Sequence, residues 1–114
     1  MSDTLFLDII DRKIPADIVY ETDQVLGFKD INAQAPHHVL FIPKQHVRTI
    51  NDLTPATAGL VGELFLAAAD YAKQQGVAED GYRVVMNCNA LAGQTVFHIH
   101  LHFLAGRAMT WPPG

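Results

Sequence analysis

Three histidines near the end of the chain alternate with apolar residues and could carry out chemistry. They are His98, His100 and His102, within the segment QTVFHIHLHFL at residues 94–104. Side chains at alternate positions of a β-strand project from the same face, so this spacing predicts three imidazoles on one face of one strand. Because an imidazole titrates near neutral pH, it can bind a metal, attack an electrophile or transfer a proton. The segment therefore predicts an active-site strand.

A zinc site is one interpretation of these histidines. At about 3.3 Å per residue, His98 and His102 would lie about 13 Å apart along a strand, too far to share an ion with Zn–N bonds of about 2.0–2.1 Å. A three-ligand site would need two of the three histidines together with His46 or His37. The single cysteine, Cys88, excludes a multi-cysteine zinc site and is expected to be inert. Zinc therefore stays an alternative.

Nucleophilic catalysis explains more of the pattern. His100, the central histidine, can attack phosphorus through one ring nitrogen if the other nitrogen donates to a fixed acceptor. Neighbouring imidazoles, with ordinary pKa values of about 6.5, can transfer protons at neutral pH. Gly93 allows the backbone to approach a ligand closely, and Thr95 offers a hydroxyl three residues before His98. A chance row of surface histidines is a poor explanation for a chain with six histidines in total.

Two helices and about five strands are expected to position the histidines. Apolar residues at helical spacing over residues 5–10 predict a short helix, which Pro15 ends. Thr54 as N-cap and Pro55 at the first helical position begin one long helix, whose apolar stripe continues to Gly76. Strands are expected at 18–21, 25–30, 39–43 and 82–87, followed by the histidine strand. This order predicts a single α+β domain over residues 1–114 with an antiparallel sheet.

The composition is that of a soluble globular protein. Of the 114 residues, 49% are hydrophobic and 18% are charged, and the net charge is −4. Acidic and basic residues are interspersed without a basic stripe, which argues against DNA or RNA as a partner but allows a single nucleotide. No apolar run reaches the ~20 residues of a membrane span, and the N-terminus lacks the features of a signal peptide. We therefore expect a cytoplasmic protein.

Several other segments accompany the histidines in a fixed order. Residues 98–104 fit the pattern His-φ-His-φ-His-φ-φ, where φ is apolar, and this pattern resembles the histidine triad (HIT) superfamily. Six more segments are similar to the Hint branch of that superfamily, the nucleoside phosphoramidases: KIPA at 13–16, FKDI at 28–31, QAP at 34–36, IPKQH at 42–46, GQTVF at 93–97 and WPPG at 111–114. The resemblance covers essentially all 114 residues.

The resemblance implies a HIT-like fold and a homodimer that binds purine nucleoside monophosphates and needs neither metal nor cofactor. It implies hydrolysis of purine nucleoside 5′-phosphoramidates, of the adenosine type, to nucleoside monophosphate and amine through a covalent nucleotidyl-histidine intermediate. A dinucleoside polyphosphate hydrolase, the neighbouring branch, is an alternative against which the WPPG ending argues. A non-catalytic nucleotide-binding regulatory protein is another.

The resemblance also implies roles for individual residues. His100 is the nucleophile, and the backbone carbonyl of His98 orients it by accepting a hydrogen bond from Nδ1–H. His46 and His102 assist protonation and phosphate binding, and Asp30 holds the ribose hydroxyls. The positions around the phosphate and leaving group are Asn87, Gly93 and Thr95. Residues 87–93 differ from the acidic, glycine-rich loop of the branch, and Thr95 replaces a common serine, so the resemblance implies the chemistry but not the preference for the leaving group.

The remaining assignments concern apolar residues and two histidines outside the motif. Phe28 and Ile31, beside Asp30, are expected to line an apolar purine slot. Trp111 is expected to cover the partner's site or its own leaving-group pocket. Four more residues are candidates for the slot but equally suit the core: Phe6, Phe41, Ile42 and Val96. Two histidines match no part of the motif and are expected to be loop and strand-start residues: His37 and His38.

Overall fold

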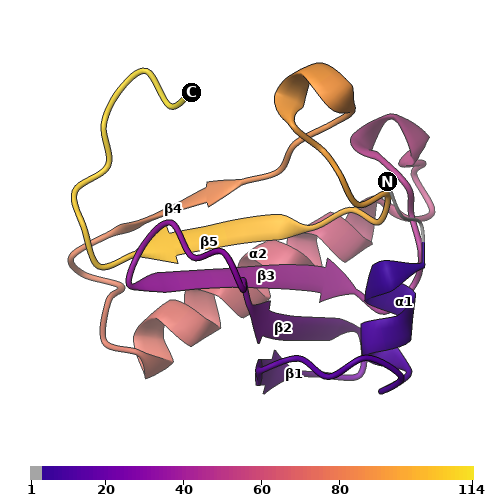
Figure 1. Cartoon of the computed structure of the whole chain (residues 1–114), viewed down its shortest axis with the longest axis horizontal. Coiled ribbons are helices and arrows are strands. Elements are labelled where there is room, and N and C mark those ends of the chain that lie inside the picture. Colours follow the sequence, from indigo (N-terminus) through magenta and orange to yellow (C-terminus); the bar gives the residue numbers. More distant parts are fainter. Residues whose placement is uncertain (1–3) are drawn as a thin grey trace.

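Five antiparallel strands form one sheet, with a helix on each of its faces (Figure 1). The structure is a computed structural model, and it describes residues 4–114. The strands lie in the order β1-β2-β3-β5-β4, so β5 sits between β3 and β4. Their bounds are β1 (Ile18–Glu21), β2 (Val25–Lys29), β3 (His37–Pro43), β4 (Tyr82–Val85) and β5 (Leu101–Ala105). The predicted α+β fold, with about five antiparallel strands, one long helix and one short helix, is confirmed.

The long helix α2 (Ala58–Gln74) packs on one face of the sheet. Phe41 of β3 and Phe103 of β5 point to this face, where both rings meet Tyr71 of α2 with centroid separations of 5.8 Å and 5.4 Å. Each large apolar side chain buried here stabilises the fold by about 1.5–3 kcal/mol. Phe41 is therefore a core residue on the far side of the sheet, and it does not line a purine slot.

The short helix α1 (Leu5–Ile10) packs on the opposite face. Its buried residues Phe6 and Ile9 contact a second apolar cluster that includes Phe28, Leu40 and Ile42. Because Leu40 pairs with His102 across β3 and β5, His102 lies on this same face. His102 is therefore separated from the α2 core by the thickness of the sheet.

The strand that carries the histidines is shorter than predicted. β5 begins at Leu101, and its last pair with β3 is Phe41 with Leu101. The preceding residues leave the ladder, since the N–H of Ile99 donates to the carbonyl of Val47 at 2.8 Å. His98 and His100 therefore lie in an irregular segment before β5, and the prediction of one strand bearing all three histidines is wrong for these two.

The start of the long helix also differs from the prediction. The long helix begins at Ala58, because residues 54–57 form a turn in which the N–H of Ala58 donates to the carbonyl of Thr54 at 2.8 Å. Gly76 follows the helix with φ of 72°, as predicted for a C′ glycine.

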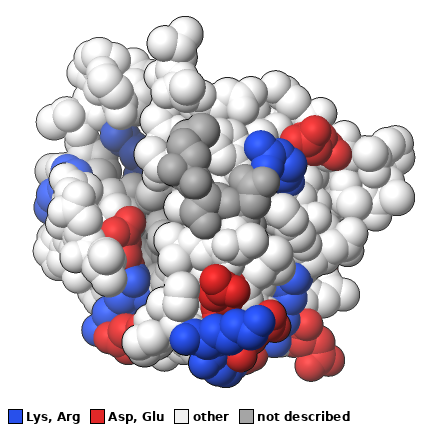
Figure 2. Space-filling model, turned by 45° about the vertical axis from the view of Figure 1, so that its right-hand side comes forward, with Lys and Arg blue, Asp and Glu red and all other residues white. Residues whose placement is uncertain are grey.

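No helix within residues 4–114 is long and apolar enough to cross a bilayer. Figure 2 shows acidic and basic side chains side by side on the face it draws, without a continuous basic stripe there.

Candidate active site

A cavity of about 450 Å³ opens between α1, the end of β2 and the segments that lead into β5. Its lining includes eight of the residues that the sequence placed around a nucleotide, but not His46: Phe28, Asp30, Ile31, Asn87, Gly93, Thr95, His100 and His102. Phe6 and Val96 also line it, whereas Ile42 belongs to the neighbouring core cluster. The cavity therefore combines an apolar lining with a small set of polar groups, as ligand sites commonly do.

A hydrogen bond fixes the ring of His100 and leaves its Nε2 available to the cavity. Its Nδ1–H donates to the backbone carbonyl of His98 at 2.8 Å, as the family resemblance implied. The ring is 7% exposed, and the ring of Phe6 meets it edge-on at a centroid distance of 5.1 Å. Burial lowers the pKa of His100 below 6.5. The imidazole is therefore neutral near pH 7, with the proton on Nδ1 and a free lone pair on Nε2.

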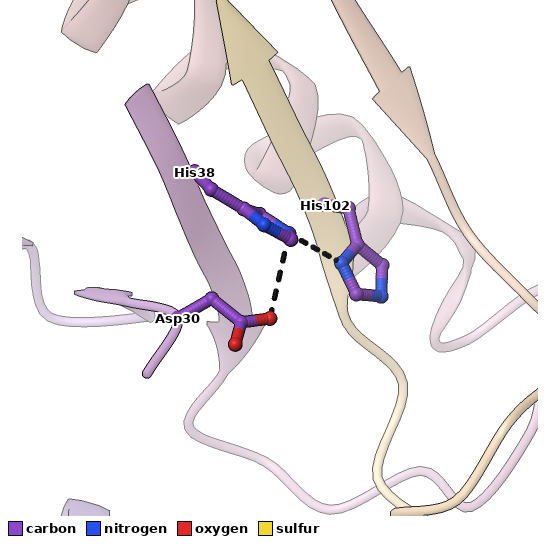
Figure 3. Close-up of side chains that lie close together, drawn as sticks. All are labelled: Asp30, His38 and His102. Atoms are coloured by element: carbon purple, nitrogen blue, oxygen red, sulfur yellow. Dashed lines mark hydrogen bonds and ion pairs between the residues drawn. The ribbon is translucent and has the colours of Figure 1, made fainter. Parts of the chain in front are cut away.

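His102 is fixed through a chain of hydrogen bonds that begins at Gln34, and Figure 3 shows the part of it between His38 and His102. The backbone N–H of Gln34 donates to Nδ1 of His38 at 3.0 Å, which leaves the proton of a neutral His38 on Nε2. That Nε2 lies 3.0 Å from Nδ1 of His102 and 3.4 Å from Oδ2 of Asp30. His102 therefore accepts at Nδ1 and carries its own proton on Nε2.

The rings of His38 and His102 are both uncharged near neutral pH. Burial is the main cause that lowers the pKa of His102 to about 4, and the neighbouring rings of His100 and His38 lower it further. Burial likewise lowers the pKa of His38, while the carboxylate of Asp30 opposes the shift. The rings of His100 and His102 lie 5.1 Å apart between centroids. The cavity thus presents a lone pair on one Nε2 beside an N–H on the other.

The residues around His102 also include a candidate group of metal ligands. In the described part of the chain, Asp30, His38 and His102 form the group whose ligand atoms all lie within 4.8 Å of one another. However, the N–H of Gln34 occupies Nδ1 of His38 and so keeps the proton on Nε2, the nitrogen that would have to bind the ion. The three side chains are therefore better arranged for a hydrogen-bond relay than for a metal site.

His98 and His46 lie outside the cavity lining. The Nε2–H of His98 donates to the carbonyl of Pro43 at 2.7 Å, and its buried Nδ1 has no hydrogen-bond partner among the described residues. Burial is the main cause that lowers the pKa of His98 to about 4. Nε2 of His46 donates to the carbonyl of Phe97 at 2.7 Å, and its ring lies 5.0 Å from that of His98. These two rings hold the segment before His100, and the predicted assistance of His46 in protonation stays a prediction.

Asp30 and Trp111 occupy different surroundings. Oδ1 of Asp30 accepts from the N–H of Asn32 at 2.8 Å, and Oδ2 faces His38, so the carboxylate is oriented from two sides. Trp111 is 81% exposed, with the guanidinium of Arg83 5.8 Å from its ring centroid. It does not line the cavity of its own chain. The alternative in which it covers a site on a second copy stays a prediction.

His38 is the site residue that the sequence reasoning missed. It lies inside β3, which begins two residues earlier than the predicted strand, and it is 6% exposed. Alternation with Leu40 and Ile42 places it on the face of His102. A strand beginning at His37 would have indicated this position, because a buried histidine at the edge of an apolar run needs a polar partner.

Comparisons with known proteins show which family the chain resembles. A profile of the HIT domain matches residues 11–109. The chain is 48% identical over 107 residues to the purine nucleoside phosphoramidase of Escherichia coli, which covers 94% of this chain and 90% of that protein. It is 52% identical over 112 residues to an uncharacterized HIT-like protein of Synechocystis, which covers 98% of this chain and 97% of that protein.

Solved structures show the same fold. The crystal structure of a HIT family hydrolase from Legionella pneumophila superposes with a TM-score of 0.94 at 48% identity, covering 96% of this chain and 98% of that one. A histidine triad nucleotide-binding protein from Candida albicans superposes with a TM-score of 0.80 at 28% identity, covering 95% of this chain and 82% of that one. On the domain match, the identities and these superpositions, the chain belongs to the HIT family.

Proposed function

We propose that this protein hydrolyses purine nucleoside 5′-phosphoramidates to a nucleoside monophosphate and an amine. The observation that carries the proposal is the pair of opposed tautomers, a lone pair on Nε2 of His100 beside an N–H on Nε2 of His102. A nucleophile and a hydrogen-bond donor side by side are what phosphoryl transfer to an enzyme group requires. The 48% identical Escherichia coli relative, named purine nucleoside phosphoramidase, supports the same reaction.

The first step forms a covalent bond to His100. Its Nε2 attacks the phosphorus, the P–N bond of the substrate breaks, and the bonding electrons leave with the amine nitrogen. The bound anion raises the pKa of the neighbouring imidazoles, so the complex takes up a proton. His102 passes its Nε2 proton to the departing nitrogen, and the proton taken up leaves its ring neutral after the transfer.

The second step returns the enzyme to its starting state. Water attacks the same phosphorus, and Nε2 of His100 leaves with its lone pair restored. The proton lost by water goes to Nε2 of His102 and returns to the solvent as the nucleotide leaves, which balances the proton taken up in the first step. The hydrogen bond from Nδ1–H to the His98 carbonyl keeps His100 in one orientation through both steps.

The rest of the cavity supplies binding. Asp30 holds the ribose hydroxyls as a charge-assisted acceptor, and Phe28 and Ile31 lie against the purine. Asn87 and Thr95 hold the phosphoryl oxygens together with backbone N–H groups near Gly93. His46 assists protonation indirectly, through its contact with the segment that carries His98.

We also propose that the active species is a homodimer. β4 is an edge strand of the sheet, and α2 exposes Phe65 and Leu66 with 49% and 65% of their surface accessible. A second copy would cover such apolar side chains and the open strand edge. Light scattering at micromolar concentration tests this: twice the chain mass of 12.6 kDa is expected, and a monomer would contradict it.

Substrate comparison tests the proposed reaction. Adenosine 5′-phosphoramidate and diadenosine tetraphosphate are incubated separately with the protein and with His100→Ala, and released AMP is measured by chromatography. We expect AMP from the phosphoramidate, none with His100→Ala, and AMP binding retained by both proteins. Hydrolysis of the dinucleotide alone would indicate the neighbouring branch, and nucleotide binding without any turnover would indicate a regulatory protein; either result contradicts the proposal.

A further inference from the structure

Gln94 is a buried glutamine between two residues that line the cavity. Gly93 and Thr95 contribute to the lining, whereas Gln94 is 2% exposed and does not. Its carboxamide makes three hydrogen bonds to backbone groups. Oε1 accepts from the N–H of Asn89 at 2.8 Å, and Nε2 donates to the carbonyls of Arg48 at 2.9 Å and Val96 at 3.1 Å. Both amide hydrogens are therefore used inside the protein.

Two bonds between Gln94 and Asn89 close the loop beside the cavity. In addition to the side-chain bond, the backbone N–H of Gln94 donates to the carbonyl of Asn89 at 3.1 Å. The short 3₁₀ turn η2 (Ala90–Ala92) lies between them. Asn89 has φ of 67° and Gly93 has φ of 90°, so both ends of the turn adopt a positive φ, which residues other than glycine disfavour. The Gln94 carboxamide therefore stabilises a conformation that Asn89 would not otherwise prefer.

The third contact ties this loop to the histidine segment. The carbonyl of Arg48 accepts from Gln94, and the carbonyl of the preceding residue, Val47, accepts from the N–H of Ile99. Ile99 lies between His98 and His100. Two adjacent carbonyls thus anchor both the loop and the segment that orients the nucleophile.

We propose that Gln94 is a positioning residue that fixes the Gly93–Thr95 side of the cavity relative to His100. It contacts no ligand itself and acts through the backbone on either side of it. The inference rests on the proposed function for the nature of the ligand, since Gly93 and Thr95 are the residues assigned to the phosphate. Loss of the Gln94 carboxamide is therefore expected to weaken the binding of the phosphate group but not that of the nucleoside.

Gln94→Met tests this, because methionine has a similar length but makes no hydrogen bond of this kind. We expect the Kd of AMP to rise about tenfold, while the Kd of adenosine, which lacks the phosphate, changes less than about twofold. The amide of Asn89 is expected to exchange its hydrogen about tenfold faster, because its acceptor is gone. Gln24→Met, in the exposed turn before β2, is the matched control and is expected to change none of these values.

Each other outcome counts against the proposal. A purely structural role would weaken the binding of AMP and of adenosine by the same factor. If Gln94→Met does not fold, Gln94→Asn replaces it, because its carboxamide is one carbon too short to reach all three partners. If the unmodified protein binds neither ligand, the proposed function fails by itself, and exchange at Asn89 still decides the role of Gln94: unchanged exchange in the variant would overturn it.

Discussion

Replacing His38 by phenylalanine tests whether the tautomer of His102 matters. The variant keeps a buried ring but removes the donor to Nδ1 of His102 and the acceptor for the N–H of Gln34. A lost hydrogen bond that leaves buried polar groups unpaired costs about 1–3 kcal/mol. If about 1.4–3 kcal/mol of this appears in the transition state, kcat/KM falls about 10- to 150-fold.

The assay is steady-state hydrolysis of adenosine 5′-phosphoramidate, with the fold checked by thermal denaturation. His37→Phe is the matched control, because His37 is the neighbouring residue of β3 and points to the opposite face. We expect this control to change kcat/KM by less than about twofold. A folded His38→Phe protein whose kcat/KM also stays within about twofold of the original would refute the reasoning that His38 fixes His102.

Three further predictions concern stability, ribose recognition and the tail. Burial lowers the pKa of His98 from 6.5 to about 4 in the folded protein, so its stabilising contribution is complete above pH 6.5 and is lost as the pH falls toward 4. His102, whose pKa is also lowered to about 4, adds to this loss, so urea unfolding at pH 7 and pH 4.5 should differ by at least about 2–3 kcal/mol; an equal free energy of unfolding at both values would contradict the assignment. Asp30→Asn should lower kcat/KM about tenfold for the adenosine substrate and little for its 2′,3′-dideoxy analogue, whereas equal losses would exclude a ribose contact. Truncation after Met109, which removes Trp111, should change the preference between small and aromatic amines, and unchanged kinetics would remove that role.

The elements of the fold followed from local patterns, because each pattern reflects burial on one face. The short helix at residues 5–10 and the apolar stripe of α2 were predicted from helical spacing and are present. The start of β5 was not predicted correctly, because the alternation of His98, His100 and His102 continues through a segment that leaves the sheet. That segment is held by carbonyls of residues 43 and 47, which are distant in sequence. Local spacing therefore indicated the strand but not the residue at which its pairing begins.

The candidate site was likewise predicted only in part. The family resemblance placed His100, Asp30 and Thr95 together, and all three line one cavity. His38 was missed because its partner, His102, is 64 residues away, and their contact depends on the pairing of β3 with β5. Gln94 was not singled out for a similar reason, since its three partners become neighbours only in the folded chain.

The proposed reaction requires a covalent bond between His100 and phosphorus. Mass spectrometry of the intact protein, quenched during reaction with adenosine 5′-phosphoramidate, detects this bond. We predict an added adenylyl mass on the protein, absent from His100→Ala and present in His37→Phe. Turnover by a folded His100→Ala protein, or an adduct that maps to another residue, would contradict the claim.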